Sequence, residues 1–201
     1  LVERQHQAAP EQRVHGVTLA PHRERPNARQ FLVEVFRDPV FGPVIRLGAG
    51  GNQGEALRDH AVALPPLNRF LASNLIDATR IGRTLAASSK RPAADRAALE
   101  DALLGLSKLV CTLPTLERLQ INPLIVDEDG CLAVDAQLTL VPLRGAGQGR
   151  YAHMAIHPYP AHLCQSWPMR DGNVVHVRPV RPEDAPLEQA FVSAMSDESR
   201  Y

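Results

Sequence analysis

Aromatic residues are scarce in this sequence, at 4% of 201 residues, so a hydrophobic core has to be built from Leu, Val, Ile and Ala. Cysteines are few as well: there are three, an odd number without any CxxC spacing. This count argues against a disulfide framework and against a zinc site. It favours buried thiols in a reducing compartment, and we therefore expect a cytoplasmic protein.

A net charge is lacking, and so are long apolar runs. Lys and Arg together number 22, and Asp and Glu together also number 22. A general nucleic-acid surface needs a basic stripe to displace counterions from phosphates, so we expect no nucleic-acid partner. No apolar run approaches the roughly 20 residues that a membrane helix needs, so we expect no membrane partner.

The first 142 residues carry clear strand and helix patterns. β-Branched and aromatic residues over 30–36 and 40–47 predict two strands, which the turn Arg37-Asp38-Pro39 joins as a hairpin. Apolar residues at three- and four-residue steps predict a helix over 95–111. The other predicted elements are a helix over 67–78 and strands over 14–19, 61–64, 119–126, 131–135 and 137–141.

From residue 143 to residue 165 the periodic pattern disappears among Gly, Pro and His. We interpret this stretch as a linker. After it the pattern restarts, with strands on both sides of Asp171-Gly172-Asn173 and a helix from Pro182 to about Met195. The expected organisation is a first domain over 1–142, a linker over 143–165 and the start of a second domain over 166–201. Neither end looks like a natural terminus, so we expect a fragment of a longer protein.

The segment 119–135 carries the most chemical information. If Asp127 to Gly130 form a four-residue hairpin loop, Asn122 lies directly opposite Asp135, with their Cβ atoms about 5 Å apart. The neighbouring Leu132 and Val134 would then share an apolar face with the alternate residues of the first strand. An amide oxygen and a carboxylate at one polar spot suit Mg²⁺, which is usually held by one or two protein groups plus substrate phosphates.

Alternatives to this metal site stay open at the level of geometry. The pair also fits an ordinary polar contact facing water, and a slip of one residue in register would separate the two side chains. Pro123 has no N–H group to donate, which predicts an edge position or a bulge nearby.

A glycine-rich turn follows the first predicted hairpin. Gly50 and Gly51 permit positive φ and a close backbone approach, as a phosphate-facing turn requires, although an ordinary turn at a strand end has the same composition. Arg37 offers a planar fork to a phosphate or carboxylate, or pairs with Asp38 in the turn. Glu55 either braces the glycine turn or caps a helix.

Three motifs in order resemble one protein family. Ile121-Asn122-Pro123-Leu124, followed by Val134-Asp135-Ala136, is similar to the closing motif of the ATP-grasp domain in NDP-forming acyl-CoA synthetases and succinyl-CoA synthetase β chains. The run from Arg37-Asp38-Pro39 to Ile45 also resembles that family, as does Gly48-Ala49-Gly50-Gly51 with Glu55. The similarity covers about residues 14–141.

This resemblance implies an α+β fold, namely the C-terminal subdomain of an ATP-grasp domain with a mainly antiparallel sheet and packed helices. It implies that Asn122 and Asp135 hold Mg²⁺ on nucleotide phosphates, with Arg37, Asp38, Gly50, Gly51 and Glu55 as cofactor-binding residues. The cofactors would be ATP or ADP with Mg²⁺, and CoA or acetyl-CoA in the full-length protein. No catalytic residue is assigned.

The chain departs from the family at one position. Many relatives carry an acidic residue two positions before the Asn, where this sequence has Gln120. The loss of that charge weakens metal binding or signals a relaxed catalytic role. The front half of the ATP-grasp domain and the phosphohistidine of the full synthetase are not in this sequence.

A second resemblance concerns residues 158–201 and begins with Pro158-Tyr159-Pro160-Ala161-His162-Leu163. Met169-Arg170-Asp171-Gly172 and the run from Val177-Arg178-Pro179 to Asp184 resemble the entry to the GNAT-type acetyltransferase domain of bacterial protein lysine acetyltransferases. The implied structure is a truncated β-hairpin and helix of that domain. The alternative is an unrelated hairpin and helix.

These observations support two enzymatic hypotheses and one that is not enzymatic. The first is an acyl-CoA ligase that works through a phosphoryl intermediate, with a nucleotide and an acyl-CoA as partners. The second is an acetyl-CoA-dependent acetyltransferase of protein lysines whose ATP-grasp half acts as a sensor or scaffold, which Gln120 and the fusion favour. The third is an interaction module.

Overall fold

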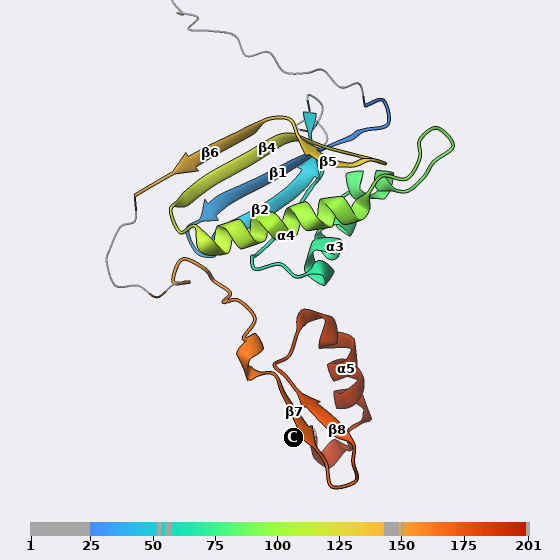
Figure 1. Ribbon diagram of the computed structural model, residues 1–201, viewed down its shortest axis with the longest axis vertical. Coiled ribbons are helices and arrows are strands. Elements are labelled where there is room, and N and C mark those ends of the chain that lie inside the picture. Colours follow the sequence, from blue (N-terminus) through green and yellow to red (C-terminus); the bar gives the residue numbers. More distant parts are fainter. Residues whose placement is uncertain (1–24, 52–53, 55–57, 143–148, 150, 200–201) are drawn as a thin grey trace, which may run out of the picture.

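A computed structural model of the protein describes residues 25–51, 54, 58–142, 149 and 151–199. In these residues a six-stranded antiparallel sheet packs against helices, and a separate two-stranded hairpin with a helix follows (Figure 1). The predicted strand over 14–19 and the candidate Glu55 lie outside the described residues.

The sheet has the strand order β3-β2-β1-β4-β5, and β6 also pairs with β4. Its strands are β1 (Arg29–Asp38), β2 (Gly42–Ala49), β3 (His60–Ala63), β4 (Leu116–Asp127), β5 (Gly130–Ala133) and β6 (Ala136–Leu140). The predicted hairpin is confirmed, because β1 and β2 pair from Phe31 opposite Ala49 to Asp38 opposite Gly42. The long strand β4 then pairs with β1 on one side and with β5 and β6 on the other.

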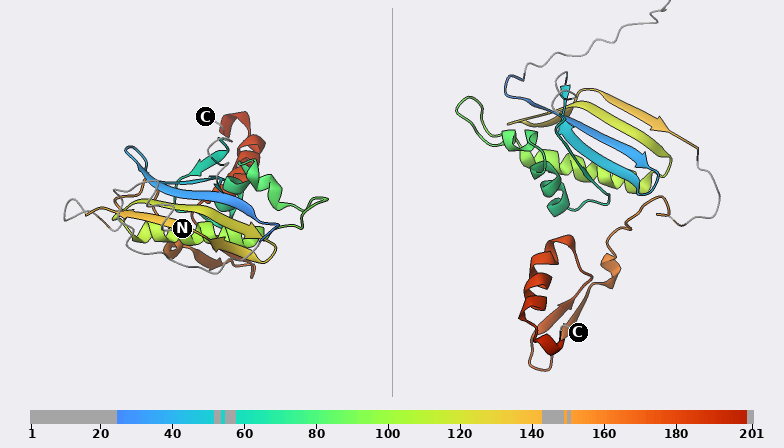
Figure 2. Two further views of the ribbon diagram at one scale, coloured as in Figure 1. Left: turned by 90° about the horizontal axis from the view of Figure 1, so that it is seen from above. Right: turned by 180° about the vertical axis from the view of Figure 1, so that it is seen from behind.

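Helices cover one face of this sheet. They are α3 (Arg69–Asp77), the short 3-10 helix η2 (Ile81–Leu85) and α4 (Arg96–Thr112). Asp95 caps α4 by accepting the Ala98 N–H at 3.0 Å, which satisfies one of the free donors of the first turn. Seen from behind, the strands lie in front of α4 (Figure 2).

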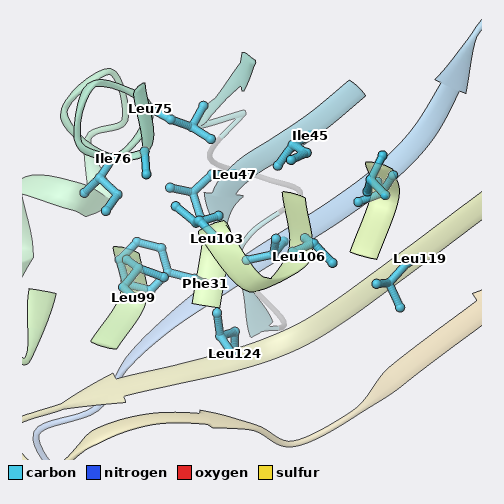
Figure 3. Packing of buried hydrophobic residues seen from close by; sticks show 14 of the residues in the cluster. Phe31, Ile45, Leu47, Leu75, Ile76, Leu99, Leu103, Leu106, Leu119 and Leu124 are labelled. Atoms are coloured by element: carbon cyan, nitrogen blue, oxygen red, sulfur yellow. The ribbon is translucent and has the colours of Figure 1, made fainter. Parts of the chain in front are cut away.

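The predicted apolar stripe of α4 forms the centre of the core. Leu99, Leu103 and Leu106 point at the sheet and are at most 7% exposed (Figure 3). Phe31 and Leu47 face them from the sheet and are fully buried. Each such side chain stabilises the fold by about 1.5–3 kcal/mol relative to an exposed position, so the core consists mainly of aliphatic side chains around Phe31.

Strand β4 contains a β-bulge, which Pro123 in the sequence predicted. Two residues of β4, Asn122 and Pro123, stand opposite the single residue Leu32 of β1, because Phe31 pairs with Leu124 and Val33 pairs with Ile121. Such a bulge changes which alternate residues face the core. Leu119 and Leu124 are therefore both buried although their numbers differ in parity.

The bulge overturns one prediction about the hairpin. Leu132 and Val134 were expected on the apolar face, but they are 41% and 56% exposed. The reason is that Leu124, and not Ile125, turns to the helices beyond the bulge, so Leu132 opposite Ile125 points away from the core.

The cysteines also differ from expectation: Cys111 is buried and Cys131 half-buried, but Cys164 is exposed.

Part of the predicted linker packs on the first domain. Residues 143–148 and 150 lie outside the described part, but Met154 is 7% exposed and belongs to the main core, with Tyr151 packed against it. The His153 ring also lies 3.0 Å from the Val110 carbonyl at the end of α4. The division at 143–165 stays a prediction, and at least residues 151–154 share the core of the first domain.

The C-terminal part begins with the short 3-10 helix η3 (Ala161–Leu163). Strands β7 (Gln165–Pro168) and β8 (Val174–Val177) pair as the predicted hairpin around a turn in which Gly172 has a φ of +86°. They lead to η4 (Pro182–Asp184), α5 (Ala185–Ala194) and η5 (Asp197–Ser199).

Among the residues that the structure describes, no helix is long and apolar enough to cross a membrane.

Candidate functional site

The glycine-rich turn lies where β2 ends beside the beginning of β1. The Gly50 N–H donates to the Gln30 carbonyl at 2.8 Å, so the turn lies tightly against β1. A Cβ at Gly50 would lie 2.3 Å from the Phe31 carbonyl oxygen, and one at Gly51 would lie 1.9 Å from Gln30 Oε1. Gly51 also has a φ of +68°, so both positions favour glycine for a physical reason.

A hydrogen bond connects this turn to the motif Ile121-Asn122-Pro123-Leu124 in β4. The Gly51 N–H donates to Asn122 Oδ1 at 2.8 Å, although the two residues are 71 positions apart in the chain. The bulge in β4 places the Asn122 side chain on the sheet face away from α4. A carbonyl oxygen has two lone pairs, so Asn122 Oδ1 keeps one for a further donor or a cation.

Asp135 lies opposite Asn122, as the sequence predicted. The pairs Leu124–Ala133 and Ile121–Ala136 flank this position in one common register. The Asn122 N–H also donates to the Asp135 carbonyl at 3.1 Å. Directly opposed residues share a sheet face, and the Asp135 side chain is exposed. The backbone of Asp135 thus lies opposite Asn122, and the placement of both side chains at one spot and their role as metal ligands stay predictions.

A pocket of about 750 Å³ adjoins the glycine turn. Its lining includes Gly50, Gly51 and Pro123, three arginines (Arg29, Arg80 and Arg91) and the carboxylate of Asp59. The excess of guanidinium groups over carboxylates favours an anionic ligand.

Two of these lining residues build the pocket wall. Arg29 is 3% exposed and donates to the carbonyls of Asn27, Thr84 and Pro92 at 2.7–2.8 Å, which ties the chain around η2 to β1. Asp59 accepts the backbone N–H groups of Arg80 and Ile81 at 2.8 and 2.7 Å. Sequence reasoning missed both residues, because all of their partners except Asn27 lie 21 to 63 positions away.

Arg37 and Asp38 lie at the other end of the β1–β2 hairpin. Arg37 donates to the carbonyls of Leu116 and Pro114 and pairs with Glu117 at 3.3 Å. Asp38 accepts the N–H groups of Val40 and Phe41, which also hold the pKa of its carboxyl below the ordinary value. The structure does not bring these two residues to the glycine turn, so their placement does not favour the predicted cofactor contact.

The described residues contain no group of three or more His, Cys, Asp or Glu side chains placed to hold a metal ion. The candidate metal position therefore combines one carboxylate, Asp135, with one amide oxygen, Asn122. Gln120 lies next to it on the same face and stands opposite Glu34 of β1. An acidic residue at position 120 would oppose that carboxylate directly, which is unfavourable for like charges.

Comparison with known proteins identifies the family to which this fold belongs. The family model described as ATP-grasp domain matches residues 1–140, more than half of the chain.

The chain belongs to the ATP-grasp domain family.

Curated relatives of this ATP-grasp domain are acyl-CoA ligases. The chain is 30% identical over 131 residues to the β subunit of ADP-forming acetate–CoA ligase I from Pyrococcus furiosus, covering 65% of this chain and 56% of that subunit. It is 31% identical over 131 residues to ADP-forming acetate–CoA ligase I from Archaeoglobus fulgidus, with 65% and 19% covered. The chain thus spans about half the length of the Pyrococcus subunit that it matches.

Solved structures give the same relationship. Acetyl-coenzyme A synthetase 1 from Ca. Korarchaeum cryptofilum, in complex with coenzyme A, Ca-AMPCP and HgCl⁺, matches with a TM-score of 0.61 and 25% identity, covering 70% of this chain and 60% of that one. Another structure of the enzyme, with coenzyme A and Mg-AMPPCP, matches with a TM-score of 0.55 and 27% identity, covering 58% and 55%. The predicted ATP-grasp fold of the NDP-forming synthetase type is confirmed, and the family match ends before the C-terminal hairpin and helix.

Proposed function

We propose that this ATP-grasp chain binds ATP or ADP together with Mg²⁺ as part of an NDP-forming acyl-CoA ligase. The observation that carries the proposal is the hydrogen bond from the Gly51 N–H to Asn122 Oδ1, since it joins two separate family motifs at one point. The named relatives are ligases of this type, and the structure of one holds coenzyme A and Mg-AMPPCP. Nucleotide and acyl-CoA would be the partners, in the cytoplasm.

The residues at this point fit a Mg²⁺ ion that shares its ligands with phosphates. Asn122 keeps one lone pair, and the exposed Asp135 carboxylate lies across the strand pair from it. Because both glycines lack a Cβ, the turn packs tightly against β1, and its Gly51 N–H reaches the Asn122 side chain. Bound with the nucleotide, Mg²⁺ would neutralise charge on the phosphates during transfer. Asn122 and Asp135 would hold the ion, and Gly51 would fix the orientation of the Asn122 amide.

The test uses the mutual dependence of metal and nucleotide binding. One carboxylate and one amide are too few ligands for Mg²⁺ alone, because the ion dehydrates reluctantly and needs phosphate oxygens. In the complete protein, Asp135→Asn should weaken Mg²⁺-ATP binding by about 1–3 kcal/mol and leave metal-free ATP binding nearly unchanged. Calorimetric titration of ATP with and without Mg²⁺ measures both quantities.

Asp129→Asn is the matched control, since it removes an exposed carboxylate from the turn of the same hairpin. It should leave both affinities unchanged. If the wild type binds ATP without any dependence on Mg²⁺, the ligase proposal loses its metal site.

A second candidate function has its own support. The neutral Gln120 departs from the acidic residue of many relatives, and the hairpin and helix over 166–201 resemble the start of a GNAT-type acetyltransferase domain. In this alternative, the ATP-grasp half is a sensor or scaffold and protein lysines are acetylated from acetyl-CoA. Absence of Mg²⁺ dependence in the titration would favour this alternative.

A further inference from the structure

The sheet face away from α4, here called the open face, carries a charged cluster that the proposed function does not use. Glu34 lies in the middle of β1 and is only 4% exposed. Its carboxylate pairs with Arg46 of β2 at 3.0 Å and with Arg118 of β4 at 2.6 Å. The three residues are cross-strand neighbours and carry a net charge of +1.

Both guanidinium groups contact the Glu34 carboxylate, and Arg46 has a second contact. Arg46 lies over the ring of Phe36, 4.8 Å from its centroid, which fixes the plane of the guanidinium. Arg118 is 57% exposed and yet makes the shorter contact with Glu34. Each arginine uses one terminal nitrogen on the carboxylate, so further N–H groups of both remain to bind a ligand.

One of these remaining donors is already removed from water. Arg46 Nε is buried and has no hydrogen-bond partner among the described residues. A buried donor without a partner costs free energy, and an incoming acceptor would recover that cost. Two fixed guanidinium groups with net positive charge match an oxyanion, because their planar forks donate two parallel hydrogen bonds.

Gln120 preserves this charge. It stands directly opposite Glu34 and lies between the cluster and Asn122 along β4. With an acidic residue at position 120, the open face would hold a second carboxylate here and the net charge of +1 would be cancelled. Arg118 and Asn122 are four residues apart, which corresponds to about 13 Å along a strand. The cluster is therefore separate from the candidate metal position.

We infer that Arg46 and Arg118, oriented by Glu34, form a phosphate-binding site on the open face of the sheet. The phosphate group belongs either to a nucleotide or to free inorganic phosphate. Glu34 is a positioning residue in this site, and the two arginines make the contact. The inference does not require Mg²⁺ binding at Asn122 and Asp135.

The test follows the arginine Nε–H resonances of the complete, ¹⁵N-labelled protein during titration with inorganic phosphate at constant ionic strength. The Arg46 and Arg118 signals should shift and saturate. Arg118→Gln should weaken phosphate binding by about tenfold, the loss expected for a charged hydrogen bond. Lys108→Gln, which removes one positive charge from the exposed side of α4, should leave the affinity unchanged.

Glu34→Gln separates orientation from simple charge attraction. It raises the net charge of the cluster by one, so an unspecific attraction of phosphate would become stronger. If Glu34 orients the two arginines, the same substitution weakens binding by about tenfold instead. Tighter binding by Glu34→Gln, or no saturable shift in the wild type, would overturn the inference. Should Glu34→Gln not fold, the wild type and Arg118→Gln decide.

Metal-free ATP identifies the source of the phosphate. If ATP shifts the same two resonances at lower concentrations than inorganic phosphate does, the site takes a nucleotide phosphate. If only inorganic phosphate shifts them, the site takes the free ion, and both results support the inference. Asp135→Asn should leave the phosphate titration unchanged, so a failure of the Mg²⁺ proposal and a failure of this site are distinguishable.

Discussion

Gly51 illustrates at the residue scale how one position serves the site through its backbone. Its φ of +68° is a region that residues with a Cβ rarely adopt, and its N–H holds the Asn122 side chain. Gly105, by contrast, lies on the exposed side of α4, where an added Cβ would meet no atom within 4 Å. The same substitution should therefore have opposite effects at the two positions.

Gly51→Ala should lower the free energy of unfolding by about 1–2 kcal/mol, the cost of a left-handed conformation for a residue with a Cβ. Gly105→Ala should raise it by about 0.5–1 kcal/mol, since alanine is favoured in the middle of a helix. Urea denaturation of both variants measures the difference. Equal effects of the two substitutions would mean that the turn does not require glycine.

At the scale of elements, the bulge in β4 determines which of its side chains face the site and which face the core. It turns Asn122 to the open face while Leu119 and Leu124 both stay in the core. The same bulge exposes Leu132 and Val134, which a regular strand would have buried. Without the bulge, β4 could not bury both Leu119 and Leu124 and also present the Asn122 amide to the glycine turn.

The junction of β8 and α5 contains a carboxylate, Asp184, whose contacts predict a pH dependence of stability. Arg178 donates two hydrogen bonds of 2.7 Å to Asp184, and the Arg181 N–H donates a third at 2.8 Å. These contacts lower the pKa of Asp184 to about 2. A carboxyl whose pKa is lowered by folding stabilises the fold above its unfolded pKa of about 3.9. That contribution is lost as the pH falls from about 4 to about 2.

We expect the NMR titration of the Asp184 carboxyl carbon to show a midpoint near pH 2. Arg178→Gln should move this midpoint up toward the ordinary value of an aspartic acid, because it removes the largest cause of the shift. A wild-type midpoint near pH 4 would show that the bidentate pair does not persist in solution.

At the scale of the whole molecule, the segment after the sheet returns to the core of the first domain. Met154 lies against that core and is 7% exposed, whereas Met169 of the C-terminal hairpin is 51% exposed. Met154→Ala should lower the free energy of unfolding by about 2–5 kcal/mol. Met169→Ala should change it by less than about 0.5 kcal/mol. Chemical denaturation compares the two, and a small effect at Met154 would place the segment outside the core.

The sequence by itself determined the hairpin β1–β2, the helix α4 with its apolar stripe and the opposition of Asn122 to Asp135. These features depend on local periodicity and on counting outward from a short turn, and both can be read along the chain. The C-terminal hairpin around Asp171-Gly172-Asn173 was predictable for the same reason.

Only the tertiary structure decided which of the predicted site residues meet. Gly51 and Asn122 come together because β1 lies between β2 and β4 in the sheet, and no local pattern encodes that order. The strand order also brings Arg118 of β4 to the buried Glu34, since cross-strand neighbours are fixed by register between segments far apart in the chain. The separation of Arg37 and Asp38 from the glycine turn by the length of a strand follows instead from the antiparallel β1–β2 hairpin.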